Sequence, residues 1–218
     1  MDILEVTPPE NNGYQRLWVP HRMAYIGGEK KPVDNSEAAC PFCDPRIGGP
    51  SVGANETTIP SVEERAARLE TTGAIGLLVV ARGQYCFVIL NLFPYNSGHI
   101  LVVPYRHISW YTDLTDDETK EFSQMTKDAI GALTTAYHPQ GFNIGMNQGE
   151  VGGAGIAAHL HQHVVPRWTG DSNFLPIIAH TKAMPEILSD TRDKLSLAWP
   201  GSGAILPGPI EAVGEGQI

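Results

Sequence analysis

The sequence predicts an α+β fold, with an antiparallel sheet of about five strands and two main helices. Short β-branched apolar runs recur between residues 75 and 104, with turn residues between them, and residues 141–147 alternate apolar side chains with glycine or asparagine. Residues 116–137 instead repeat apolar side chains at helical spacing, directly after a capping box. Further on, three histidines alternate with other residues at 159–163, which is the period of a strand.

The amino-terminal third is expected to form an extension, residues 1–74, that packs on this core. Its run 17–26 is rich in aromatic and apolar residues, so we expect it to pack against the domain or a second subunit. Prolines and glycines make 44–60 loop-like, and the charged stretch 61–69 predicts one short solvated helix.

The core is expected to begin with a hairpin formed by residues 75–82 and 85–92, followed by a third strand at 99–104. Thr115 and Glu118 form the capping box of the long helix, which ends before Pro139. A fourth strand at 141–147 leads through a glycine-rich loop to a ladder strand at 159–166.

The carboxy-terminal part is expected to add a second helix over residues 185–199, with Pro185 in its first turn. Residues 200–218 are rich in glycine and proline and lack periodicity, so we expect a disordered tail. The predicted organisation is therefore an extension at 1–74, a domain with its helix at 75–199, and a tail at 200–218.

Composition narrows the class of protein. The net charge of −9 over 218 residues argues against a nucleic-acid binder and against an anionic membrane surface as partner. Three cysteines, an odd and low number, fit a reducing compartment, so we expect a cytoplasmic protein. Residues 1–5 contain two acidic side chains and no apolar stretch follows, which predicts no signal peptide. No apolar run approaches the roughly 20 residues needed to span a membrane.

The histidine ladder, His159, His161 and His163, is open to three interpretations. The first is a set of structural histidines, and the second is a zinc hydrolase, although no carboxylate lies beside the ladder to act as ligand or base. The third is a histidine nucleophile that attacks phosphorus while its neighbours orient it. The glycine-rich stretch 147–155 favours the third interpretation, because backbone N–H groups there can approach an anion closely.

The ladder resembles the signature of the histidine-triad family of nucleotide hydrolases and transferases, His-φ-His-φ-His-φ-φ with φ apolar, except that Gln162 replaces one φ residue. The run from Leu90 through Pro94, Gly98-His99 and Pro104 to His107 resembles a second motif of that family. The resemblance covers about residues 75–168 and implies the histidine-triad fold. The flanking segments resemble the branch of dinucleoside tetraphosphate phosphorylases, or ATP adenylyltransferases.

The resemblance also implies roles for individual residues. His161 would be the nucleophile that forms an adenylyl-histidine, His159 would position its ring, and His163 would stabilise charge on the phosphate oxygens. Asn91 is expected to contact the ribose and Leu90 the base. Asn147 and the amides of Ala154 and Gly155 are expected to contact phosphate. Trp168 and Arg167 are expected to reach toward the distal phosphates or the second base.

Cys40-Pro41-Phe42-Cys43 is a C-x-x-C pair, which by itself fits a redox pair, half of a zinc site or two buried thiols. The resemblance implies a structural zinc held by Cys40, Cys43, His107 and His159. The chemistry itself is expected to require no cofactor.

Many relatives carry Gln and then Ser or Thr just before the triad, where the hydroxyl can protonate a basic leaving group. Gly155 and Ile156 stand there in this chain, which favours dinucleoside polyphosphates over phosphoramidates. The glycine-rich loop and Arg167 favour inorganic phosphate as acceptor, so that diadenosine tetraphosphate would give ADP and ATP.

Three alternatives stay open: a hydrolase that releases AMP, a zinc-dependent hydrolase, and a nucleotide-binding module without turnover. The expected assembly is a homodimer or a higher homo-oligomer, because the family typically pairs two sheets edge to edge.

Overall fold

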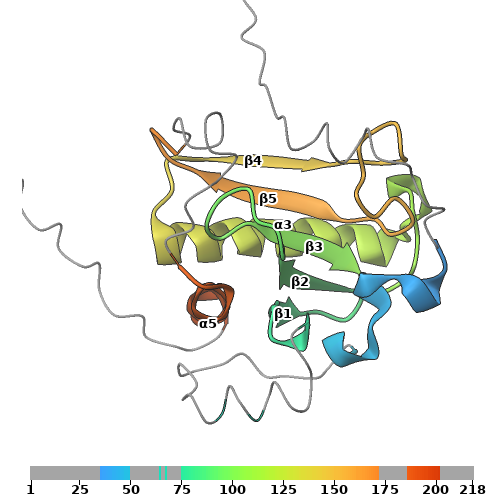
Figure 1. Cartoon of the computed structure of the whole chain (residues 1–218), viewed down its shortest axis with the longest axis horizontal. Coiled ribbons are helices and arrows are strands. Elements are labelled where there is room, and N and C mark those ends of the chain that lie inside the picture. Colours follow the sequence, from blue (N-terminus) through green and yellow to red (C-terminus); the bar gives the residue numbers. More distant parts are fainter. Residues whose placement is uncertain (1–34, 50–63, 65–66, 68–74, 172–185, 202–218) are drawn as a thin grey trace, which may run out of the picture. The chain divides into compact units, whose positions relative to one another are not determined.

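The computed structural model describes residues 35–49, 64, 67, 75–171 and 186–201. Its strands form one antiparallel sheet in the order β1-β2-β3-β5-β4 (Figure 1). They are β1 (Val79–Arg82), β2 (Cys86–Leu90), β3 (Ile100–Pro104), β4 (Gly141–Met146) and β5 (Gln162–Arg167). The sheet, together with two longer α-helices within the described residues, confirms the predicted α+β class.

The longer helix is α3 (Asp116–Tyr137), and the shorter is α5 (Leu188–Ala198). The predicted capping box opens α3: the Thr115 side chain accepts from the backbone N–H of Glu118, and the Glu118 side chain accepts from that of Thr115. His138 ends the helix in the left-handed region, at φ 46°. Short 3-10 turns add η1 (Glu37–Ala39), η2 (Pro41–Cys43), η3 (Pro45–Ile47) and η4 (Tyr111–Asp113).

Each face of the sheet is covered by a different part of the chain. On one face, α3 and α5 contribute Phe122, Leu133 and Leu195 to a core with Val88, Val102 and Val164. On the other face, Cys40, Phe42 and Ile47 from the 3-10 turns pack with Phe87, Ile89, Leu101 and Val103. Alternate residues of a strand point to opposite faces, so β2 and β3 contribute side chains to both cores.

The turn between β1 and β2 is fixed to α3 by a carboxylate. Glu121 accepts hydrogen bonds from the backbone N–H groups of Gln84, Tyr85 and Cys86 at 2.8, 2.5 and 2.7 Å. These donors have no ladder partner at the end of the hairpin, and the helix side chain supplies one.

Three elements begin at least three residues later than expected. β1 begins at Val79 because Ile75 and Gly76 form a helical turn, and α5 begins at Leu188 rather than residue 185. β5 begins at Gln162 rather than residue 159, because the backbone before it pairs with the segment after β3, where Leu160 N–H donates to Ile108 C=O at 2.6 Å. Of the three ladder histidines, His163 therefore lies in β5, whereas His159 and His161 lie in the segment before it.

Several expectations lie outside the described residues: the packing of 17–26, most of the loop and helix at 50–69, and the tail at 202–218. The domain boundaries at residues 74 and 200 stay predictions. No helix within the described part of the chain is long and apolar enough to cross a membrane.

Candidate active site

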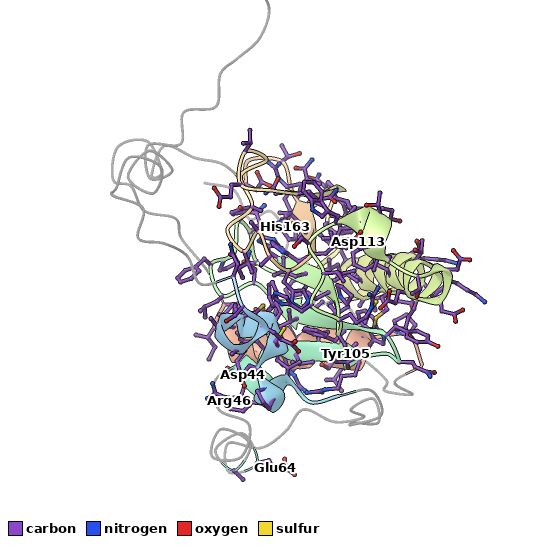
Figure 2. All side chains as sticks on the ribbon, turned by 90° about the vertical axis from the view of Figure 1, so that its right-hand side faces the viewer. Asp44, Arg46, Glu64, Tyr105, Asp113 and His163 are labelled. Carbon is purple, nitrogen blue, oxygen red and sulfur yellow. The ribbon has the colours of Figure 1, made fainter. Side chains whose placement is uncertain are left out.

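The three ladder histidines lie on the sheet face opposite the helices. The intervening Gln162 points to the helices, where its Nε2–H donates to the Thr126 hydroxyl at 2.8 Å, and Val164 belongs to the helix-side core. His159 and His161 are 1% and 5% exposed, and His163, labelled in Figure 2, is half-buried. The rings of His161 and His163 meet edge to face, with centroids 5.1 Å apart. His161 and His163 are therefore in contact, and the side chains of His159, His161 and His163 are together called the imidazole surface below.

His161 has a defined free ring nitrogen. Its Nδ1 lies 2.8 Å from the backbone oxygen of His159. A carbonyl oxygen only accepts, so Nδ1 carries the proton and Nε2 carries the lone pair. Burial lowers the pKa of His161, which keeps the ring neutral at physiological pH. A neutral imidazole with an unprotonated Nε2 is the form that attacks phosphorus.

His163 is held from behind by another histidine. Its Nδ1 lies 2.9 Å from Nε2 of His99, a residue with no exposed surface. The Tyr95 ring stacks on His163 with centroids 5.8 Å apart. Burial, followed by the charge that His161 would carry, lowers the pKa of His163 to about 4. His163 is thus a second neutral imidazole, fixed beside the first.

Cys40, Cys43, His107 and His159 come together as the sequence predicted, with their ligand atoms all within 4.8 Å of one another. Nδ1 of His159 lies 3.3 Å from Cys40 Sγ and 3.4 Å from Cys43 Sγ, and Nδ1 of His107 lies 3.2 Å from Cys43 Sγ. A tetrahedral zinc ion with ordinary bond lengths separates sulfur and nitrogen ligands by about 3.5 Å. The four side chains therefore fit a closed, structural zinc site.

The surroundings of the cluster also suit a metal. Nε2 of His159 lies 2.9 Å from the Pro104 oxygen, and Nε2 of His107 lies 3.2 Å from the Asn35 oxygen. Each Nε2–H thus donates to a carbonyl and leaves the Nδ1 lone pair facing the sulfurs, as in second shells of metal sites. Burial, then Cys40, raises the pKa of Cys43 to about 12, so its ionisation requires a cation nearby.

In the loop between β4 and β5, the conformation of the loop's own backbone requires glycine at several positions. Gly149 and Gly153 have φ of 71° and 81°, and a Cβ on Gly152 would lie 2.3 Å from the Gln148 oxygen. The Ala154 N–H points to the Gly149 oxygen at 3.4 Å. It is therefore not directed outward, as the expected contact of this amide with phosphate requires. Only at Gly155 is there open space, since an added Cβ meets nothing within 4 Å.

Among the residues expected to contact substrate, Asn147 directly follows β4. Met146 pairs with Gln162 at the end of the β4–β5 ladder, so Asn147 follows at the level of His161. Asn91 lies beside the site through its Nδ2, 3.3 Å from Nδ1 of His99, but its Oδ1 accepts from Phe93 N–H at 3.0 Å.

Leu90 requires a correction, because the structure does not bring it to the histidines. Leu90 pairs with Ile100 and both belong to the helix-side core, where Leu90 is 3% exposed. It therefore packs on the opposite face of the sheet from His163.

Arg167 requires a second correction. Its guanidinium is bonded to Asp171 at 2.5 and 2.9 Å and to the Asn143 side chain at 2.5 Å. The fork expected to receive a second anion is already occupied by this carboxylate. Trp168 is half-buried, and its backbone N–H donates to Asp171 at 3.2 Å. The residues around Arg167 thus stabilise the turn after β5.

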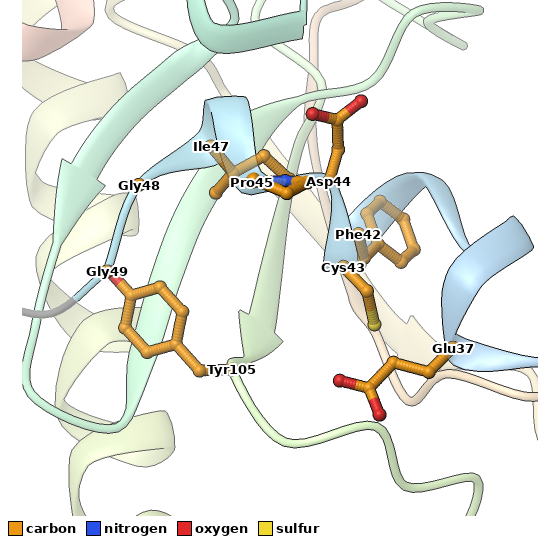
Figure 3. A pocket seen from close by; sticks show the side chains of 9 residues that line it. All are labelled: Glu37, Phe42, Cys43, Asp44, Pro45, Ile47, Gly48, Gly49 and Tyr105. Carbon is orange, nitrogen blue, oxygen red and sulfur yellow. The ribbon is translucent and has the colours of Figure 1, made fainter.

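A pocket of about 220 Å³ lies beside the cysteines, among the side chains drawn in Figure 3. Glu37, Cys43 and Tyr105 line it, whereas no ladder histidine does. The Tyr105 hydroxyl is buried and has no hydrogen-bond partner within the described part of the chain. This pocket borders the metal cluster and is separate from the imidazole surface.

Sequence reasoning missed two contributors to the site. In the sequence His99 stands out only as part of a motif, although a histidine directly before an apolar strand is a signal for a site residue. In the sequence Phe42 is only a spacer between two cysteines, yet its ring centroid lies 5.5 Å from that of His159 and 5.3 Å from that of His161.

Comparison with known proteins gives concordant results. The HIT domain family matches residues 74–170. The AP-4-A phosphorylase of Mycobacterium tuberculosis is 40% identical over 188 residues, covering 85% of this chain and 84% of that protein. A hypothetical histidine triad nucleotide-binding protein from Sulfolobus tokodaii has a TM-score of 0.48 at 25% identity, covering 56% of this chain and 82% of that structure. A Zn-bound histidine triad family protein from Mycobacterium smegmatis has a TM-score of 0.47 at 24% identity, with the same two coverages.

Proposed function

Because this chain belongs to the HIT domain family, we propose that it is a nucleotidyltransferase that cleaves diadenosine tetraphosphate through an adenylyl-histidine on His161. The observation that carries the proposal is the Nδ1–H bond of His161 to the His159 carbonyl, which leaves an unprotonated Nε2 on a buried, neutral ring. Binding alone does not require such a nucleophile. The 40% identity to a protein named AP-4-A phosphorylase supports the same substrate.

In the first step, the Nε2 lone pair of His161 forms a bond to the α-phosphorus, and the bond from that phosphorus to the bridging oxygen breaks. ATP leaves, and the imidazole becomes cationic while its Nδ1–H still donates to His159. This hydrogen bond strengthens as the ring gains charge, and so it stabilises the intermediate more than the free enzyme.

In the second step, an oxygen of inorganic phosphate attacks the same phosphorus and forms ADP. The N–P bond breaks, and its electron pair returns to Nε2 of His161. Asn147, which follows Met146 at the end of the β4–β5 ladder, would bind phosphate oxygens through its amide. Neither step calls for a proton donor, since ATP is a weak base, and Gly155 and Ile156 offer no hydroxyl.

Zinc has a structural part in this proposal. Cys40, Cys43, His107 and His159 would hold it in a closed tetrahedral site, where it adds stability and supplies no open coordination position for substrate. His159 would thereby be fixed from its Nδ1 side, and its carbonyl is the group that orients His161. The protein's partners would be the dinucleotide, phosphate and a second copy of the chain.

The test is product analysis with radiolabelled inorganic phosphate. Incubation with diadenosine tetraphosphate is expected to yield ATP and ADP in equal amounts, with the label in the β-position of ADP and turnover that rises with phosphate. AMP and ATP without incorporation would identify a hydrolase instead. Activity that survives His161→Ala would exclude the covalent route altogether.

A further inference from the structure

The four ligands of the cysteine–histidine cluster differ in how far they can be reached from outside. Cys40 and His159 are 8% and 1% exposed, whereas Cys43 and His107 are half-buried. His159 is further enclosed by Phe42, since the centroids of the two rings lie 5.5 Å apart. An ion that joins the folded protein therefore has to pass Cys43 or His107.

The pocket beside the cysteines distinguishes these two approaches. Cys43 lines it, and no other member of the cluster does. The chain itself occupies the side of His107, because Nε2 of His107 lies 3.2 Å from the Asn35 oxygen and its ring meets that of His159 edge to face, with centroids 5.1 Å apart. The pocket volume of about 220 Å³ is several times the roughly 30 Å³ of one water, so an ion can enter it with waters attached.

A carboxylate without a partner lines the same pocket. Glu37 is an exposed residue of η1, and its side chain has no hydrogen bond or ion pair within the part of the chain that the structure describes. In Figure 3 the Glu37 carboxylate extends toward the Cys43 sulfur, and it is close enough for its charge to act on that thiol. A carboxylate oxygen binds zinc directly, and its charge attracts a cation from a distance.

The second carboxylate of the pocket is already occupied. Asp44 accepts from the Arg46 guanidinium at 2.8 and 2.5 Å and from the Arg46 backbone N–H at 2.9 Å. This ion pair neutralises the Asp44 charge and engages both of its oxygens. Of the two carboxylates that line the pocket, Glu37 is therefore the one with free capacity to bind a cation.

We propose that Glu37 is the entry ligand for zinc: it captures the hydrated ion in the pocket and passes it to Cys43, from which the closed cluster forms. The role is transient, because Glu37 is not among the ligand atoms that lie within 4.8 Å of one another, and those four complete a tetrahedral site. As the ion moves on, its remaining waters and the protons of the two cysteines go to solvent, and the carboxylate is released.

A transient ligand changes how fast zinc is exchanged and leaves the final site unchanged. In a variant of Glu37 the resident ion keeps all four ligands of the cluster, so the zinc content and the melting temperature should match the wild type. Entry and exit follow the same path, so both rates fall by the same factor. The net charge of −9 attracts cations to the whole molecule, and a control therefore has to separate local capture by Glu37 from this general attraction.

The first experiment measures isotopic exchange in the zinc-loaded, full-length protein without nucleotide. Radiolabelled zinc is added, and the bound label is followed over time after rapid desalting. Glu37→Gln is expected to slow the exchange about tenfold at full zinc content. Asp44→Asn is the matched control, because it removes the same formal charge from the same pocket and should exchange at the wild-type rate. Equal rates in Glu37→Gln and the wild type would overturn the proposal, as would equal slowing in both variants.

The second experiment obstructs the route and leaves the carboxylate in place. Gly49 lines the pocket, and a Cβ added there meets nothing within 4 Å, so Gly49→Leu extends a side chain into open space. We expect this variant to slow zinc exchange at full zinc content. Gly131→Leu, which adds the same side chain on the exposed face of α3, should not.

Exchange at the wild-type rate in Gly49→Leu would show that the ion takes another path and would overturn the proposal, as would a wild-type protein that takes up no zinc. The measurement is independent of the proposed nucleotidyl transfer. Slow exchange in Glu37→Gln, together with a wild-type protein that does not cleave diadenosine tetraphosphate, would support zinc entry through Glu37 and count against the proposed function alone.

Discussion

Phe42 packs its ring against that of His161 at a centroid distance of 5.3 Å, so the segment that carries the two cysteines touches the nucleophile. The same ring meets His159 edge-on at 5.5 Å. Because Phe42 stands between Cys40 and Cys43, closing the metal cluster also fixes the ring that supports His161. The metal site and the candidate active site therefore share one packing unit.

Replacing Phe42 by leucine is expected to lower kcat about tenfold while the zinc content stays at one ion per chain. A smaller side chain leaves space behind His161, and loss of orientation at a nucleophile lowers the rate without removing the group. Metal analysis and steady-state kinetics on the same preparation check this. The control is Phe42→Met, which fills more of the space; unchanged kcat in the leucine variant would refute the coupling.

His161→Ala is expected to lower turnover by at least about 10³-fold and to keep the fold, since the variant removes the attacking nitrogen and leaves the sheet cores intact. Thermal unfolding and single-turnover kinetics measure the two effects separately. Residual activity of more than a few per cent would show that another group attacks phosphorus. His138→Asn serves as a control for the loss of one histidine, since His138 is exposed and asparagine suits its left-handed backbone.

Cys43→Ser is expected to abolish stoichiometric zinc binding and to lower the melting temperature. Cys43 contacts both histidines of the cluster, at 3.2 and 3.4 Å, so its loss opens the tetrahedron. Cys86→Ser is the matched control, because Cys86 is a buried thiol outside the cluster and should leave the zinc content unchanged. Equal zinc content in Cys43→Ser and the wild type would contradict the assigned ligands.

The sequence predicted those parts of the molecule that depend on local periodicity. Alternation placed Gln162 and His163 on opposite faces of β5, and the Thr115–Glu118 box located the start of α3 to the residue. Gln162, the departure from the family signature, follows the same alternation and lies against α3. These features depend on neighbours within four residues, which a single sequence displays.

Contacts between side chains on different strands could not be predicted from the sequence. His99 and His163 are 64 residues apart, and nothing in either segment shows that their nitrogens meet. Arg167 looks available in the sequence, because nothing there marks Asp171, four residues on, as its partner. The glycines near residue 150 looked like an anion cradle, whereas three of them serve turns in the loop itself. Local composition does not distinguish these uses.

Glu118 is expected to make the fold acid-labile. The Arg106 guanidinium, at 2.7 and 2.6 Å, and Thr115 N–H, at 2.8 Å, lower the pKa of Glu118 to about 2 from 4.5. A pKa that is lower in the folded state means that the stabilisation is present above pH 4.5 and is lost as the pH falls through that value toward about 2.

Melting temperatures at about pH 5 and about pH 3 test this window. Glu118→Gln should lower stability at the higher pH and flatten the decline between the two, whereas the exposed Asp117→Asn should keep the wild-type slope. An unchanged slope in Glu118→Gln would assign the acid lability to other carboxylates.

Gln162 and Thr126 are expected to behave as one buried pair. The Gln162 amide donates to the Thr126 hydroxyl at 2.8 Å, and that hydroxyl donates to the Phe122 oxygen at 2.8 Å. Thr126→Val leaves the 9%-exposed Gln162 amide without its acceptor, which should cost about 1–3 kcal/mol in the free energy of unfolding. Adding Gln162→Leu, which restores the apolar residue of the family signature, should recover most of that loss.

Urea unfolding of both single variants and the double variant measures the coupling, and strictly additive effects would show that the pair does not act as a unit. Because Gln162 points away from the imidazole surface, the double variant should also keep kcat within about twofold of the wild type.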